Sequence, residues 1–92
     1  MQPTQPLVSV IIPVYNSKKR LAACLDHVAA MDYPKLEVIL VDDCSTDGSL
    51  EICREYEKKY PYFHVITKEN EGVSAARNLG MQESHGQYIQ FV

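Results

Sequence analysis

Short apolar segments alternate three times with longer segments in which apolar residues recur every three or four positions, and this alternation limits the fold most strongly. The apolar segments are rich in β-branched residues and cover residues 7–12, 36–41, 63–67 and 88–92. The periodic segments cover residues 17–31, 50–59 and 73–84. The first kind suits strands covered on both faces, and the second suits amphipathic helices. Gly86 follows the last periodic segment and is expected to stop that helix.

A helix between two successive strands makes a crossover that leaves the strands parallel. The sequence therefore predicts an α/β fold, a three-layer sandwich with a mainly parallel sheet and helices on both faces. The 92 residues suffice for one small domain. We expect residues 1–6 to form a disordered or extended start and residues 7–92 to form the folded unit.

Parallel strands end at one edge of the sheet, which is where open α/β folds bind ligands. Pro13, Tyr15, Asp42 and Asp43 end or follow the first two apolar segments, so we expect them along that edge. Adjacent carboxylates at the end of a buried strand repel each other and cost stability unless a function offsets this cost. In the alternative interpretation Asp43 only pairs with amides at the start of the next helix, a role that we expect for Asp47.

An aromatic residue and an arginine near this edge suggest contacts to a ligand. Tyr15 can stack on a nucleobase, a contact that contributes about 1–3 kcal/mol, or it can pack against the chain. Arg77 stands among Ala75, Ala76 and Asn78 and has no obvious partner close by in the sequence. Small residues in such a place let a ligand come close, or let the helix pack tightly on the sheet.

Charge and apolar patterning exclude several classes of protein. Nine Lys and Arg against twelve Asp and Glu give a net charge of −3, which disfavours electrostatic binding to nucleic acid. The apolar runs are far shorter than the ~20 residues of a membrane span. The first residues lack the pattern of a secretory signal, so cytoplasmic residence is expected. The three cysteines and three histidines show neither paired nor metal-ligand spacing, so we expect reduced thiols and no metal site.

Three motifs, in this order, resemble those of the family 2 glycosyltransferases. They are VSVIIPVYN at residues 8–16, VDDCSTD at residues 41–47 and NEGVSAARN at residues 70–78. The resemblance covers nearly the whole chain and continues into GQYIQFV at residues 86–92. It implies a nucleotide-binding, Rossmann-like fold of the A type, of which this chain would be the first half. It also implies that the strands lie in the order three, two, one, four.

The family transfers a sugar from a nucleotide diphosphate, here expected to be UDP, to a polysaccharide, lipid or similar acceptor. By position, Tyr15 resembles the family's aromatic residue against the uracil, Pro13 begins the same wall, and Asp43 resembles the acid that hydrogen-bonds the base. Asp42 completes the acidic pair, and Arg77 resembles a contact to base or phosphate. The cysteine directly after the pair departs from the Gly or Asn that the family often has. The resemblance implies polysaccharide and cell-envelope biosynthesis, in the cytoplasm or at the inner face of the membrane.

The resemblance also implies a divalent metal, Mn²⁺ or Mg²⁺, in the full-length enzyme. The family places its metal-binding Asp-x-Asp motif directly after the strand that residues 88–92 begin, and this sequence has no such motif. We therefore expect residues 7–92 to be the nucleotide-sugar-binding portion of a longer catalytic domain, truncated before the metal motif. We expect this portion to contain no catalytic residue and to be inactive alone. A sheet cut there exposes apolar surface and an open edge, so we expect self-association or marginal stability.

Two other classes of protein stay open as alternatives. Paired aspartates after a strand also occur in response-regulator receiver domains. Those domains place the pair after the first strand and an acceptor Asp after the third, where this chain has Thr67-Lys68-Glu69. A catalytically silent nucleotide-binding or interaction fragment is the other alternative. Binding of uridine nucleotides would indicate the glycosyltransferase class, and a response to acyl phosphates would indicate a receiver domain. A response to neither would indicate the silent fragment.

Overall fold

The computed structural model describes residues 6–31, 33–69 and 72–92. Strands and helices alternate in this part of the chain in the order β1 (Val8–Val14), α1 (Lys18–Ala29), β2 (Leu36–Asp43), α2 (Ser49–Lys59), β3 (Phe63–Lys68), α3 (Val73–Glu83) and β4 (Tyr88–Phe91). The strands form one parallel sheet in the order β3-β2-β1-β4. The predicted α/β class, the parallel sheet and the strand order are confirmed. The start at residues 1–6 lies outside the described residues except for its last residue.

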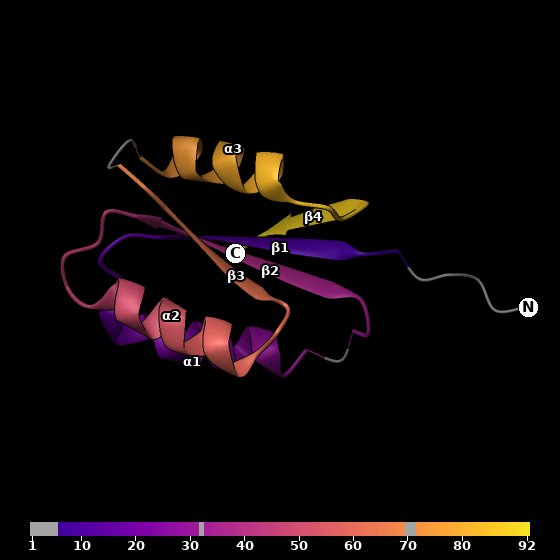
Figure 1. Cartoon of the computed structure of the whole chain (residues 1–92), viewed down its shortest axis with the longest axis horizontal. Coiled ribbons are helices and arrows are strands. Elements are labelled where there is room, and N and C mark those ends of the chain that lie inside the picture. Colours follow the sequence, from indigo (N-terminus) through magenta and orange to yellow (C-terminus); the bar gives the residue numbers. More distant parts are fainter. Residues whose placement is uncertain (1–5, 32, 70–71) are drawn as a thin grey trace, which may run out of the picture.

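Helices cover both faces of the sheet and make the three predicted layers. Figure 1 shows α1 and α2 together on one face and α3 on the other. Leu21, Leu25 and Val28 recur at steps of four and three along α1 and are buried against the sheet. None of the helices among the described residues has the length and apolarity needed to cross a membrane.

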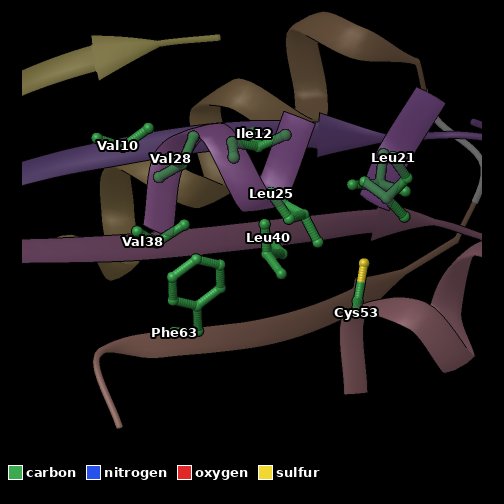
Figure 2. Packing of buried hydrophobic residues seen from close by; sticks show 10 residues of the cluster. Val10, Ile12, Leu21, Leu25, Val28, Val38, Leu40, Cys53 and Phe63 are labelled. Carbon is green, nitrogen blue, oxygen red and sulfur yellow. The ribbon is translucent and has the colours of Figure 1, made fainter. Parts of the chain in front are cut away.

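The larger hydrophobic core lies between the sheet and the pair α1 and α2. Figure 2 shows how aliphatic side chains of α1 meet those of β1 and β2, with a ring and a thiol from β3 and α2 beside them. Its buried members are Val10, Ile12, Val14, Leu21, Leu25, Val28, Val38, Leu40, Cys53 and Phe63. Burial of this apolar surface is the main stabilising contribution to the fold.

The core under α3 is smaller and depends on close approach of the helix. Its buried members are Ile11, Ile39, Val41 and Ala76. A Cβ atom on Gly80 would lie 2.4 Å from Cγ2 of Ile11, so the missing side chain lets α3 approach β1 closely. At Ala76 and Gly80 the small residues of α3 thus serve packing.

The chain between α3 and β4 differs from the sequence-based prediction. The helix ends at Glu83, and Gly86 does not have the positive φ of a helix-ending glycine. A Cβ atom on Gly86 would lie 2.4 Å from Oγ and 2.7 Å from N of Ser9. The prediction that Gly86 stops the helix is wrong, because glycine is required here where the chain passes close to β1.

Candidate functional site

A shallow cavity of about 230 Å³ opens at the carboxyl edge of the sheet, where α3 begins. It is lined by Pro13, Val14, Tyr15, Ser17, Asp43 and Ala76. The ends of β1 and β2 meet there because the two strands are paired in parallel. The cavity brings together Pro13, Tyr15 and Asp43 from the five residues that the sequence singled out.

The carboxylate of Asp43 supplies the charge of this cavity, although Asp43 is only 4% exposed. Its Oδ2 accepts a hydrogen bond from the backbone N of Gly72 at 2.9 Å, and its Oδ1 lies 3.4 Å from Nζ of Lys68. Both partners belong to β3 or to the connection into α3, so Asp43 fastens that connection to β2. A buried carboxylate needs such partners, because an uncompensated buried charge is strongly destabilising.

Lys68 is the residue of this site that sequence reasoning missed. The apolar segment predicted for this strand ends at residue 67, whereas the structure extends β3 to Lys68 and makes Lys68 the register partner of Asp43. Its side chain is 8% exposed, and Nζ also donates a hydrogen bond to the carbonyl of Glu69 at 2.8 Å. The pairing follows from the register of β2 against β3. The sequence holds only a weak signal for it, since Lys68 directly follows one apolar segment and Asp43 is the second residue after another.

Tyr15 stands at the mouth of the cavity and is 48% exposed. Its ring belongs to neither hydrophobic core of the described residues. Its carbonyl accepts a hydrogen bond from Oγ of Ser17 at 3.1 Å, which helps to fix the turn into α1. An exposed ring beside a buried carboxylate offers a face for stacking and an acceptor for an N–H group.

Asn16 joins the turn after β1 to the turn after β2. Its Oδ1 accepts a hydrogen bond from the backbone N of Thr46 at 2.8 Å, and its own N donates to Oγ of Ser45 at 3.0 Å. Asn16 and Cys44 have φ values of 46° and 61°, in the left-handed region. Asparagine tolerates this region better than most residues, whereas cysteine has no local hydrogen bond to offset the steric cost. The two turns at this edge are therefore hydrogen-bonded to each other, and the backbone is strained at Cys44.

Asp47 caps two helix starts, and the predicted capping role is confirmed. Its Oδ1 accepts hydrogen bonds from N and Oγ of Ser49 at 3.0 and 2.6 Å, and its Oδ2 accepts one from N of Lys18 at 3.1 Å. The hydrogen bond from the Ser49 hydroxyl is the main reason that the pKa of Asp47 lies below its ordinary value. Beside it, Lys19 and Arg20 line a second cavity of about 450 Å³.

Asp42 faces away from Asp43, because side chains alternate between the two faces along a strand. Its residue is 2% exposed and does not line the cavity. Its Oδ2 accepts a hydrogen bond from N of Ser45 at 3.2 Å, and its Oδ1 has no hydrogen-bond partner among the described residues. Burial is the main cause that raises the pKa of Cys53 to about 12, and the charge of Asp42 is the second cause. The acidic pair is thus divided between the two faces of the sheet.

Arg77 is exposed on α3 and is not among the residues that line the cavity, although its neighbour Ala76 is. Its guanidinium carbon lies 5.6 Å from the ring centre of Phe91, within the range of a cation–π contact. Arg77 therefore has a partner in space, on β4, that its local sequence does not reveal.

The described residues at this edge do not fit a divalent metal. Mn²⁺ or Mg²⁺ requires several oxygen ligands around one point. Within the described ranges, no group of three or more His, Cys, Asp and Glu side chains is placed to hold a metal ion. Asp42 and Asp43 face opposite sides of the sheet, and the ammonium of Lys68 beside Asp43 would repel a cation.

Comparison with known proteins gives a consistent match. The profile of the family described as Glycosyl transferase family 2 matches residues 9–92. The poly(ribitol-phosphate) beta-glucosyltransferase of Bacillus spizizenii is 44% identical over 89 residues, which cover 92% of this chain and 14% of that protein. S. aureus TarS 1–349, solved in complex with UDP-GlcNAc, has a TM-score of 0.80 and 35% identity over 94% of this chain and 26% of TarS 1–349.

A second solved structure gives the same fold from a different organism. The mannosyltransferase PcManGT from Pyrobaculum calidifontis, in complex with GDP-Man and Mn²⁺, has a TM-score of 0.82 and 32% identity over 94% of this chain and 26% of its own. These likenesses confirm the Rossmann-like fold of the A type. The chain spans 12% and 35% of the length of two curated relatives that it matches, GlyA of Streptococcus pneumoniae and TuaG of Bacillus subtilis.

Proposed function

The chain belongs to glycosyl transferase family 2, and from this premise we propose that residues 7–92 bind the nucleotide of a UDP-sugar in a longer enzyme. That enzyme would transfer the sugar to a polysaccharide, lipid or similar acceptor. The observation that carries the proposal is the half-exposed ring of Tyr15 beside the buried carboxylate of Asp43 in one cavity. The donor class is supported by the UDP-GlcNAc and GDP-Man bound in the solved relatives.

In the proposed complex the uracil ring stacks on Tyr15 above the wall that Pro13 begins. Asp43 accepts a hydrogen bond from an N–H group of the base. Arg77 reaches the base or the phosphates from α3, one residue after the cavity-lining Ala76. Asp42 supports the site from the other face by holding the backbone N of Ser45. The roles of stacking and hydrogen bonding follow from the exposed ring and the buried acceptor.

The diphosphate is the part of the donor that these residues serve poorly. In the longer enzyme we propose that Mn²⁺ or Mg²⁺ neutralises it, with ligands outside the residues named here. The chain itself has a net charge of −3 and places Asp43 and Asp47 at the same edge. We therefore expect UDP binding by this chain to be weak, selective for uridine, and nearly indifferent to either metal.

Calorimetry of the 92-residue chain with UDP and GDP, each with and without Mn²⁺, tests the proposal. Tyr15→Ala and Asp43→Ala should abolish the binding of UDP. Tyr88→Ala is the matched control, because Tyr88 is an exposed tyrosine on β4 that does not line the cavity. Equal affinity for GDP, or UDP binding that survives both cavity variants, would contradict the proposal. No binding of any nucleotide would favour the silent interaction fragment.

Location and assembly are part of the same proposal. We propose a role in cell-envelope polysaccharide synthesis, with the protein in the cytoplasm or at the inner face of the membrane. Self-association is supported by the edge strand β4, where Tyr88 is 62% and Phe91 is 42% exposed. Sedimentation of the 92-residue chain should show dimers or larger species as concentration rises. A cooperative monomer at high concentration would argue against this part.

A further inference from the structure

A carboxylate is buried on the α3 side of the sheet at the edge opposite to the candidate nucleotide site. Glu37 is 8% exposed, and its Oε2 accepts hydrogen bonds from Oγ of Ser9 at 2.7 Å and from N of His85 at 2.8 Å. Its Oε1 lies 2.7 Å from the ring Nδ1 of His85. The backbone N of Gly86 donates to Oγ of Ser9 at 2.9 Å. These contacts tie the corner between α3 and β4 to β1 and β2.

The corner determines where β4 begins on β1. Ser9 and Glu37 are register partners in β1 and β2, so the cluster is built on the two central strands of the sheet. The next residue after the corner, Gln87, donates from its N to the carbonyl of Leu7 at 2.8 Å, and pairing then runs along β4. Every side chain of β4 is exposed, so side-chain burial contributes little to holding this strand.

We propose that Ser9, Glu37 and His85 form a pH-sensitive latch that fastens the α3–β4 corner to β1 and holds β4 in register. Protonated His85 makes a charge-assisted hydrogen bond to Glu37. When the ring loses its proton, a neutral Nδ1–H still donates but the ionic contribution is lost, so the corner opens more often.

The charges around the cluster set the pH range. Hydrogen bonding to Glu37 and the charge of that carboxylate raise the pKa of His85 above 6.5, and Glu83 acts in the same direction. The contribution of His85 is therefore complete below about pH 6.5 and is lost as pH rises through the raised pKa. His64 on β3 is the other imidazole that faces this group, across a cavity of about 200 Å³ that Glu37, Glu83 and His85 also line.

Glu37 limits the latch on the acid side. Burial alone would raise its pKa, but the hydrogen bonds from His85 and Ser9 outweigh burial, and the pKa lies below 4.5. Its contribution is present above about pH 4.5 and is lost as pH falls through the lowered pKa. The latch is thus firmest between about pH 4.5 and 6.5 and loosens on either side.

Amide hydrogen exchange and a histidine titration of the 92-residue chain test the latch. We expect the His85 ring to titrate above pH 6.5, and the protection factors of Gly86 and the β4 amides to fall about threefold from pH 6 to pH 8.5, because a charge-assisted hydrogen bond is roughly twice as strong as a neutral one. In His85→Gln the fall should disappear. In His64→Gln, the matched control, it should persist.

A second variant keeps the latch testable if His85→Gln does not fold. Ser9→Ala removes the link between Gly86 and Glu37, so it should lower the protection of Gly86 at every pH while leaving the fall with pH in place. If the His85 ring titrates at or below pH 6.5, the latch is wrong. The latch is also wrong if the protection factors of His85→Gln still fall between pH 6 and pH 8.5, or if only His64→Gln removes that fall.

Discussion

The two faces of the sheet use the same strands but bury different groups. The face under α1 and α2 holds the larger apolar core, whose side chains Figure 2 shows. The face under α3 holds a smaller apolar core with Glu37 buried toward one end and Asp43 at the other. Because side chains alternate along β2, one strand serves both faces. The difference indicates that the α1–α2 face contributes most of the stability, and we propose that the α3 face carries recognition.

The strongest test of this division removes a large side chain from each face. Leu25→Ala, at a fully buried position of α1, should lower the free energy of unfolding by about 2–5 kcal/mol. Leu79→Ala on α3 should cost less than half as much, because Leu79 is only partly buried. Urea denaturation of both variants measures the two losses. Equal losses would show that the faces contribute alike.

Gly80→Ala tests how closely α3 is packed. The new Cβ would lie 2.4 Å from Cγ2 of Ile11, and such overpacking costs about 1–3 kcal/mol. In an Ile11→Ala background the same change should cost much less, because the opposing methyl is gone. Thermal denaturation of the four proteins gives the coupling. An additive pair would mean that α3 does not press on Ile11.

Replacing each aspartate of the divided pair sharpens the comparison of faces at the site itself. Asp43→Asn should weaken UDP binding by about 10-fold or more, since a hydrogen bond to a charged group contributes roughly 1.5–3 kcal/mol. Asp42→Asn should change the affinity less, because Asp42 lies on the other face. Circular dichroism verifies folding and calorimetry gives the affinities. A larger loss in Asp42→Asn would reverse our assignment.

Cys44→Gly should have the smallest effect and the opposite sign. With φ at 61°, the residue occupies a conformation that costs a side-chain-bearing residue about 1–2 kcal/mol. Glycine removes this strain but raises the entropy of the unfolded chain, so we expect a net gain of up to about 1 kcal/mol. Cys44→Ala is the control and should give no gain, because alanine keeps the Cβ. Destabilisation by glycine would show that the thiol makes a useful contact.

The local hydrophobic pattern predicted the alternation of strands and helices, because buried strands and amphipathic helices repeat short periods. The family resemblance of the motifs predicted the strand order. The cavity residues Pro13, Tyr15 and Asp43 could be predicted together, since parallel strands end at one edge. Contacts that depend on register or close approach could not. Lys68 meets Asp43 only through the pairing of β2 with β3. Arg77 meets Phe91 across the gap between α3 and β4.

An NMR titration of the 92-residue chain with uridine tests most directly whether the α3 face carries recognition. We predict that the largest amide shifts fall at Val14, Tyr15, Asp43 and Ala76, with small changes along α2. Uridine lacks phosphates, so the result does not depend on a metal. Largest shifts at Lys19 and Arg20, which line the neighbouring cavity, or no shifts at the residues around Tyr15, would contradict the account.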